Sequence, residues 1–523
     1  MILMLIAATA AKSQETVFAL LKGDLKLADK YFEAKDYQSA LVLYKNVAKK
    51  KRIKGLDLKI ARSHHFLKQY NKAVAAYDKH AQNNTLSVPD IFYYAEAQSG
   101  ISNYGKAVES YEHYLSKVDD PVIMKKVWRL NNIQFLFEDS SHYAVRPIQI
   151  NTTSGELCAV PYKAGVVFIS NRKEIQPIEI TDASLHAPFY RIYFSNMVRE
   201  TANSDILHYQ SPSIFSKEFN PKFHAGPLAF YDDERKIVFS STAGKRKHSN
   251  GKTLQLYFAE NKAGSWKITG AFPYNGDTYS ISNPTISKDG TVLYFSSDMK
   301  GGFGGKDLYK SEFVNGQWTK PVNLGENINT AFDEVFPYLH HQALYFASDG
   351  HPGLGGLDIF KAEQDRTGFL EAQNLGYPLN TNHDDFGIVI DSSDTHGFFT
   401  SNRKAGGYND DIYEFDMDLQ SYPLQITGVM KFKEHSWSDT LELKSMPNAK
   451  IFVIDNTRNV TVQETVCDGQ GNFSIVIPHH SKYKIKVVGE DQEEHIVSLE
   501  IPKHRKANDR HEIVIVKDAF KSN

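Results

Sequence analysis

The stretch Leu293-Tyr-Phe-Ser-Ser-Asp298-Met-Lys-Gly-Gly-Phe-Gly-Gly-Lys-Asp307-Leu-Tyr-Lys joins two apolar segments through a connection rich in glycine. It predicts a pair of β-strands, because aromatic residues favour strands and glycines permit tight turns. The first strand ends in a serine that recurs as Ser170, Ser241, Ser297, Ser348 and Ser401. The last three intervals are 56, 51 and 53 residues, and a unit of about fifty residues built from short strands has the size of a propeller blade.

Five units of this kind lie within residues 141–420, which predicts a five-bladed β-propeller. A sixth blade remains open at this point, because the first interval is 71 residues long. Arg146–Thr152 matches the linkers Asn323–Thr330 and Asn374–Thr381, which precede later units. We therefore expect Tyr143–Ile150 to supply the outer strand of the last blade, which closes the ring and removes exposed sheet edges.

The repeated strings of this region resemble those of a known family. Tyr294-Phe-Ser-Ser-Asp298 and Gly301-Gly-Phe-Gly-Gly-Lys-Asp307 are similar to the repeats of PD40 (WD40-like) propellers, as in TolB and in envelope proteins of Bacteroidetes. The resemblance implies a β-propeller over residues 141–420.

Residues 15–140 carry a different repeat. Two tyrosines flank an alanine at intervals of 33 and 34 residues, which predicts stacked helical hairpins: the alanine lets two helices approach, and the second tyrosine fills the groove beside it. The pattern resembles the tetratricopeptide repeat (TPR), with 121–138 as a capping helix. It offers a concave surface for a partner, or serves as a spacer. The expected packing residues are Tyr37, Ala40, Tyr44, Tyr70, Ala73, Tyr77, Tyr104, Ala107 and Tyr111.

Residues 424–517 return to alternating strands. About ninety residues of such strands suit a β-sandwich. Ile426-Thr-Gly-Val429, Pro447–Val453 and Thr465–Phe473 resemble a carboxypeptidase-regulatory-like (prealbumin-like) domain. The predicted fold is therefore α-helical repeats, then a propeller of five or six blades, then a C-terminal sandwich.

In each glycine-rich loop, an acidic or amide residue stands nine positions before an aspartate, as Asp298 stands before Asp307. Such an aspartate can accept hydrogen bonds from the amides of its own loop, and we expect this structural role. Calcium bound by the loop carboxylates is the alternative, although the loops lack the dense ligand string of an EF-hand. The residues concerned are Asp298, Asp307, Asp349, Asp358 and Asp411.

Other candidate chemistry is weak in the sequence. Asp333-Glu334 and Asp384-Asp385 stand 51 residues apart at the same place in successive units, which indicates a repeated structural part and not a catalytic pair. His340-His341 are neighbours on an expected strand, where side chains alternate between faces, so they make poor joint metal ligands. The sequence therefore predicts no catalytic residue, no metal, no cofactor and no enzymatic activity.

Composition limits the remaining possibilities. The chain has 523 residues and a formal net charge of −2, which gives no long-range attraction for nucleic acid or anionic lipid. No internal apolar run approaches the roughly 20 residues of a membrane helix. Residues 1–13 fit a secretory signal peptide that lacks the usual basic start. Cys158 and Cys467 lie about 300 residues apart, and we expect two buried free thiols.

The order of the three parts resembles Bacteroidetes envelope proteins of the PorE type, from type IX secretion and gliding machinery. These usually carry a further OmpA-like domain, for which no segment is seen here, so direct anchoring to peptidoglycan is not expected. The resemblance implies a non-catalytic periplasmic scaffold at the outer membrane that binds envelope proteins, with a barrel of the PorP/SprF kind as a partner. The alternatives are a glycan- or peptide-binding propeller of the cell envelope, and a propeller hydrolase or lyase.

Overall fold

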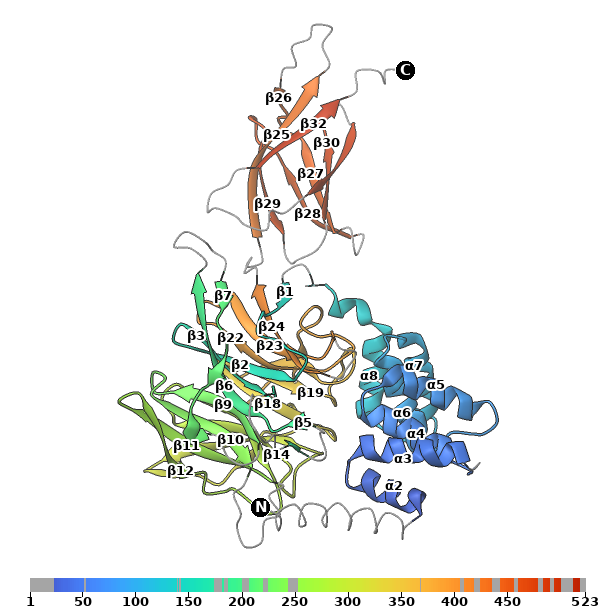
Figure 1. The fold of residues 1–523 in the computed structure, drawn as a ribbon. Coiled ribbons are helices and arrows are strands. Elements are labelled where there is room, and N and C mark those ends of the chain that lie inside the picture. The colour runs from blue at the N-terminus through green and yellow to red at the C-terminus, as the bar shows by residue number, and fades with distance from the viewer. Residues whose placement is uncertain are drawn as a thin grey trace. The chain divides into compact units, whose positions relative to one another are not determined.

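The computed structural model has helices first and β-sheets after them, as the sequence predicts (Figure 1). It forms two compact units: among the described residues, the first holds the helices, five sheets of four or five strands and a two-stranded hairpin, and the second holds two further sheets. The predicted signal peptide, residues 1–13, lies outside the described residues. The structure describes residues 23–50, 53–138, 140, 143–173, 181–182, 187–199, 207–219, 224–242, 253–366, 368–404, 409–417, 424–434, 443–455, 460–477, 483–489, 493–499 and 511–517.

The helices form three hairpins and a final helix. The alanines of the repeat, Ala40, Ala73 and Ala107, are fully buried, so each allows close approach of the paired helix. The helix expected over 121–138 ends at Asn131, and a short 3₁₀ turn follows. The elements are α2 (Asp24–Glu33), α3 (Tyr37–Lys50), α4 (Leu56–Phe66), α5 (Tyr70–Ala81), α6 (Val88–Ser99), α7 (Tyr104–Leu115), α8 (Pro121–Asn131) and η1 (Ile133–Leu136).

The tyrosines of the repeat occupy two environments. Tyr37, Tyr70 and Tyr104 begin their helices and are half-buried, whereas Tyr44, Tyr77 and Tyr111 lie in the interior. The hydroxyl of Tyr44 donates to Asp29 of the preceding helix at 2.7 Å, and the hydroxyl of Tyr111 donates to Glu96, 15 residues upstream in each case.

The middle hairpin departs from this arrangement. The residue 15 positions before Tyr77 is Arg62, whose guanidinium donates to both oxygens of Asp90 at 2.7 Å. Among the described residues, the buried hydroxyl of Tyr77 therefore has no hydrogen-bond partner. The tyrosine ring fills the same volume in all three hairpins, while its hydroxyl bond depends on the neighbouring helix.

Five sheets of antiparallel strands follow, each with its strands in the order of a propeller blade. From the inside outwards, the first sheet holds β2 (Glu156–Tyr162), β3 (Gly165–Ser170), β6 (Arg191–Arg199) and β7 (Leu207–Tyr209) with β8 (Ser213–Ile214), and the second holds β9 (Ala225–Tyr231), β10 (Lys236–Thr242), β11 (Leu254–Lys262) and β12 (Ser265–Ala271). The third sheet holds β13 (Ile281–Ile286), β14 (Val292–Ser297), β15 (Asp307–Val314) and β16 (Gln317–Trp318) with β17 (Val322–Asn323), and the fourth holds β18 (Glu334–His340), β19 (Ala343–Ser348), β20 (Asp358–Glu363) and β21 (Gln373–Asn374). The fifth sheet holds β22 (Asp385–Ile390), β23 (His396–Ser401), β24 (Asp411–Met417) and β1 (Tyr143–Pro147). The long first interval is taken up within the first of these sheets, where β4 (Thr181–Asp182) and β5 (Ala187–Pro188) form an extra hairpin, and η3 (Lys217–Phe219) precedes the second.

The last sheet takes its outer strand from the beginning of the ring. β1 pairs with β24, which confirms the predicted closure. The amide of Ile148 donates to the carbonyl of Ile412 just beyond the strand, at 3.1 Å. The guanidinium of Arg146 in β1 reaches Glu414 at 2.6 Å and Asp416 at 2.5 Å, both in β24. Hydrogen bonds and ion pairs thus join the two ends of the ring.

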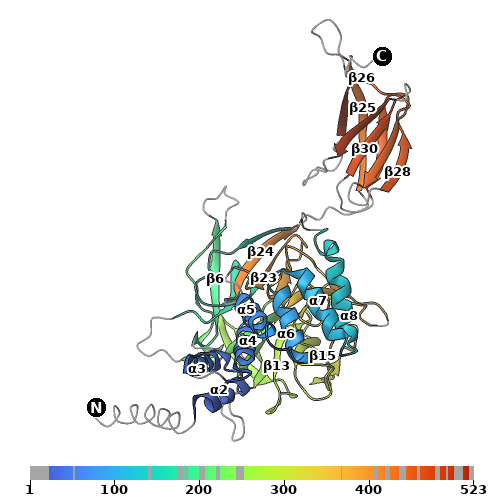
Figure 2. The same cartoon turned by 90° about the vertical axis from the view of Figure 1, so that its right-hand side faces the viewer.

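The helices pack on one side of the ring, as Figures 1 and 2 show. Phe332, in the loop before β18, joins the apolar cluster of α6, α7 and α8, with its ring 5.9 Å from that of Phe92 and 5.2 Å from the ammonium of Lys126. The hydroxyl of Ser99 donates to the carbonyl of Leu354 at 3.0 Å. Part of the helical surface that the sequence offers to a partner is therefore occupied by the ring.

One lysine of the helices supports this contact by pairing with a buried aspartate of the ring. Lys68, after α4, donates to Asp384 of the ring at 2.6 Å. Burial by itself would raise the pKa of Asp384, but the ammonium of Lys68 holds that pKa below its usual value.

The second unit consists of two sheets around one core. One sheet joins β25 (Leu424–Glu434), β26 (Leu443–Ser445), β29 (Asn472–Ile477) and β32 (His511–Lys517), and the other joins β27 (Lys450–Asp455), β28 (Val460–Val466), β30 (Tyr483–Val488) and β31 (Glu494–Leu499). Ile426, Ile475, Ile451 and Ile485 contribute to the same buried cluster from the two sheets. Cys467 is buried there as a free thiol, and Cys158 is buried in the ring, as expected.

Among the described residues, no helix is both long enough and apolar enough to cross a bilayer.

Two ion pairs between the helices and the ring differ in burial and allow a matched test. We expect Lys68→Gln to lower the free energy of unfolding of the first unit by about 1–3 kcal/mol, because it leaves the carboxylate of Asp384 buried without its cation. Lys125→Gln removes the exposed pair with Glu371, so its cost should stay below about 0.5 kcal/mol. Urea unfolding followed by circular dichroism measures both, and equal costs would contradict the proposed importance of Lys68.

Candidate functional site

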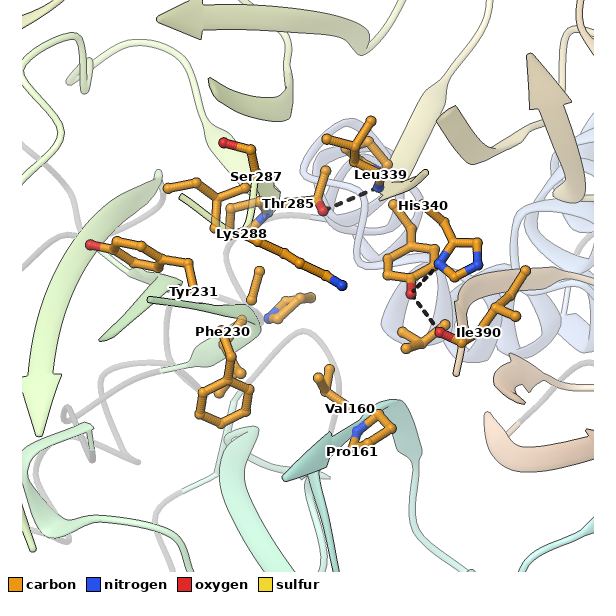
Figure 3. A pocket seen from close by; sticks show the side chains of 18 of the residues that line it. Val160, Pro161, Phe230, Tyr231, Thr285, Ser287, Lys288, Leu339, His340 and Ile390 are labelled. Atoms are coloured by element: carbon orange, nitrogen blue, oxygen red, sulfur yellow. Dashed lines mark hydrogen bonds between the residues drawn. The ribbon is translucent and has the colours of Figure 1, made fainter. Parts of the chain in front are cut away.

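The five inner strands, β2, β9, β13, β18 and β22, surround a cavity of about 960 Å³ on the axis of the ring (Figure 3). Its walls are mainly apolar and include Val160, Pro161, Phe230 and Phe336. Polar side chains gather where the inner strands turn into the second strands, among them Lys288, His340 and Asp391. The cavity is therefore an apolar space with a polar mouth.

A bulge in every inner strand shapes the wall. The pairing with the second strand shifts register at 157–160, 282–285, 335–338 and 386–389, and between β9 and β10 at the same level. Four residues in these bulges, Cys158, Asn283, Phe336 and Gly387, have φ of 54°, 52°, 53° and 64°. A left-handed residue in a bulge redirects its side chain, and all four line the cavity.

One cluster at the mouth is not repeated around the ring. His340 ends β18, His341 lies in the turn after it, and Asp394 lies in the turn between β22 and β23. One ligand atom from each of the three lies within 4.8 Å of the others. Nε2 of His340 contacts Oδ1 of Asp394, and Nε2 of His341 lies 3.2 and 3.3 Å from the two oxygens of that carboxylate. Among the described residues, no other group of histidine, cysteine or acidic residues meets in this way.

The two histidines therefore point to the same place, and the prediction that their side chains diverge is wrong. Strand alternation fails after His340 because His341 has φ of 53°, outside the β region. The two-residue turn His341-Gln342 rotates the second imidazole towards the first, and the ring centroids are 4.2 Å apart. Asp394 also has a left-handed φ, of 59°.

A tyrosine on the cavity wall orients the first histidine. The hydroxyl of Tyr338 donates to the carbonyl of Ile390 at 2.7 Å, and its oxygen lies 3.3 Å from Nδ1 of His340. Burial raises the pKa of Tyr338 to about 12, so the phenol keeps its proton at neutral pH. Since that proton points to Ile390, the oxygen is placed to accept from Nδ1 of His340, and Nε2 of the ring faces the cluster.

The other charged side chains at the mouth differ in their hydrogen-bond and ion-pair partners. Asp391 accepts hydrogen bonds from Ser393 and from backbone amides of its own turn. Asp232 is paired with Arg235 and Lys236. Lys288 extends into the cavity in Figure 3 and is exposed. The hydrogen bond from His340 lowers the pKa of Asp394, so this carboxylate is charged at neutral pH.

The paired carboxylates of the sequence lie at the opposite ends of the inner strands. Glu334 accepts from the amide and hydroxyl of Thr330 at 2.8 and 2.7 Å, and from the hydroxyl of Ser348 at 2.7 Å. Asp385 accepts in the same way from Thr381 and also from Arg403. Because the bonds repeat from blade to blade, the structure confirms that these residues are a repeated structural part.

Four of the five carboxylates considered as calcium ligands accept hydrogen bonds from backbone amides, although Oδ1 of Asp358 has no partner among the described residues. Asp307 accepts from the amides of Phe303 and Gly304, Asp358 from the amide of Leu354, Asp298 from the amide of Ser280, and Asp349 from the amide of Asp333. Asp411 is buried at the start of β24. In the described part of the chain, these residues do not come together as three or more ligands of one ion.

Comparison with known proteins gives matches among solved structures and not among family models or curated proteins. No family model matches it, and no curated protein matches it. Solved structures that resemble it include an α-L-arabinofuranosidase from Lactobacillus brevis (13% identity, 50% of this chain and 90% of that chain, TM-score 0.30) and a GH43_1 enzyme from Xanthomonas citri (11%, 59% and 95%, TM-score 0.34). A protein of unknown function from Dyadobacter fermentans is similar at 11% identity, over 50% of this chain and 76% of that chain, with a TM-score of 0.32.

These neighbours contradict the function predicted from the sequence. They include glycoside hydrolases, which contradicts the predicted non-catalytic periplasmic scaffold, and neither it nor its binding-module alternative is retained. The ring also occupies part of the helical surface on which that prediction relied. At these identities and TM-scores the likeness concerns the fold alone and assigns no substrate to this chain.

The burial of Glu334 predicts a pH effect on stability. Burial raises the pKa of Glu334 to about 7, above the ordinary value of 4.5, so the folded state holds this proton more tightly than the unfolded state does. Binding of this proton adds about 3 kcal/mol to the free energy of unfolding below about pH 4.5, and this contribution is lost as the pH rises towards 7.

Glu334→Gln should remove this dependence. The difference in unfolding free energy between wild type and variant should be largest at pH 4.5 and should shrink as the pH rises to 7.5. Urea unfolding at several pH values measures it, with Glu371→Gln, an exposed glutamate, as the control. A difference that stays constant with pH would refute the assignment.

Proposed function

We propose that the chain is a hydrolase that binds a small molecule in the axial cavity and cleaves it at the His340–His341–Asp394 end. The observation that carries the proposal is the unrepeated cluster at the mouth of an otherwise repetitive ring. In the first sheet, the two-residue turn that corresponds to His341-Gln342 holds Lys163 and Ala164 instead. The turn of the first sheet has the same length without imidazoles, so folding does not require the two histidines, and chemistry explains them better.

The cavity suits a small ligand. Its volume of about 960 Å³ lies in the range of small-molecule sites, roughly 300–1,000 Å³. Apolar walls favour a substrate with an apolar body, and the charged mouth favours a polar group at the reacting end. Lys288 supplies a positive charge there, next to the acidic turn at Asp232.

The exposure of the cluster favours water as the second reactant. The side chain of His341 is 62% exposed and that of Asp394 is 39% exposed, whereas His340 is 11% exposed. Imidazole and carboxylate groups in this setting activate water. In the hydrolysis, the hydroxyl of the water joins the electrophilic atom of the substrate, and a proton goes to the leaving group.

The finer fold and the location are also proposals. The buried alanines at the repeat period support TPR-like hairpins. The closed ring of five sheets supports a five-bladed WD40-like propeller, and the common core of the last two sheets supports a prealbumin-like sandwich. The relation to PorE-type proteins and the periplasmic location stay predictions from the sequence.

A bulky side chain in the cavity should abolish turnover. We expect the wild-type chain to release p-nitrophenol from at least one of three substrate classes: carboxylic esters, phosphate esters and glycosides. Val160→Trp fills the cavity wall and should lower kcat/KM at least tenfold, whereas Val322→Trp, on an outer strand and 65% exposed, should leave it within twofold.

Circular dichroism and thermal unfolding establish that both variants fold. No release from any class by the wild type would contradict the proposal, and so would full activity in folded Val160→Trp.

A further inference from the structure

We infer that His340, His341 and Asp394 bind one divalent transition-metal ion, with zinc as the best match. The inference rests on the proposed function only for the role of the ion, since the site itself stands on the geometry of three side chains. It also reverses the sequence-based expectation of no metal.

The ligand chemistry favours zinc over calcium. Two imidazoles and one carboxylate form a set typical of zinc and related ions, whereas calcium takes six to eight oxygens. Metal–ligand bonds of about 2.0–2.2 Å in a tetrahedron place ligand atoms about 3.3–3.5 Å apart. Nε2 of His341 lies 3.2 and 3.3 Å from the oxygens of Asp394, close to that spacing, whereas Nε2 of His340 touches Oδ1 and has to move away from it to admit an ion.

The hydrogen bonds around His340 also fit a ligand. With Nδ1 placed to donate to Tyr338, Nε2 of His340 meets the carboxylate of Asp394. Two acceptors face each other unless a second proton or a cation lies between them. An outer partner that fixes the tautomer of a histidine is the usual arrangement at metal sites.

The turns hold the other two ligands firmly. His341 and Asp394 occupy left-handed positions in turns of neighbouring blades, and the closed ring fixes the distance between these turns. Three protein ligands leave at least one coordination position open, as in catalytic zinc sites, and the exposed side chain of His341 places that position within reach of solvent. A bound ion would there lower the pKa of a water molecule and supply the nucleophile of the proposed hydrolysis.

The test titrates the untagged, metal-free full chain with Zn²⁺ by isothermal titration calorimetry. We expect one ion per chain. His341→Asn and Asp394→Asn should weaken binding at least tenfold, and asparagine tolerates the left-handed backbone at both positions, so the turns should persist. His113→Asn, an exposed histidine at the end of α7, is the matched control and should bind as the wild type does. Tyr338→Phe should weaken binding about tenfold if it acts through the tautomer of His340.

Thermal unfolding without metal shows whether each variant is folded, and Zn²⁺ should raise the midpoint of the wild type but not that of His341→Asn. Absence of binding, or equal binding by wild type and folded His341→Asn, would overturn the metal site and leave two histidines in contact with Asp394 alone. Zinc binding without hydrolysis of any substrate class would overturn the proposed function alone. Hydrolysis that persists in a chelator and in His341→Asn would overturn the role of the ion in hydrolysis, whereas the metal site itself is decided by the calorimetry.

Discussion

Closure of the ring by β1 is the constraint on which the rest of the structure depends. A blade without its outer strand leaves a row of unpaired backbone groups, and a ring that stays open has no fixed axis. The pairing of β1 with β24, with Arg146 between Glu414 and Asp416, joins residues about 270 positions apart. Only after this pairing do five inner strands enclose one cavity, and only then do turns of neighbouring blades reach a defined separation.

The features that repeat from blade to blade and the residues that differ between blades have different physical origins. Glu334 and Asp385, with their threonine partners, fold the start of the inner strand in the same way in successive blades, and the register shifts recur in all five. These features follow from local geometry, which every blade must satisfy. The mouth is under no such constraint, because a short turn accepts many sequences provided that it permits a left-handed residue. The residues that differ between blades therefore collect where they can meet a ligand.

Much of the fold could be predicted from the sequence because its signals are periodic. The serine spacing predicted the blades, the linker before β2 predicted the closure, and the spacing of Ala40, Ala73 and Ala107 predicted the helical hairpins. The candidate site could not be found in this way. Its histidines were judged by strand alternation, and one left-handed φ at His341 invalidates that rule. Asp394 lies 53 residues further on, so its proximity depends on the closed ring, although comparing the same turn across all blades would have marked the histidines as unusual.

The positions of His341 and Asp394 also have an evolutionary consequence. Left-handed turn positions accept glycine and asparagine readily, so either ligand can be exchanged by a single substitution at little cost to folding. Relatives with the same closed ring can therefore gain or lose this chemistry independently of their architecture. The fold of this chain therefore indicates its ancestry, whereas the cluster alone indicates its activity.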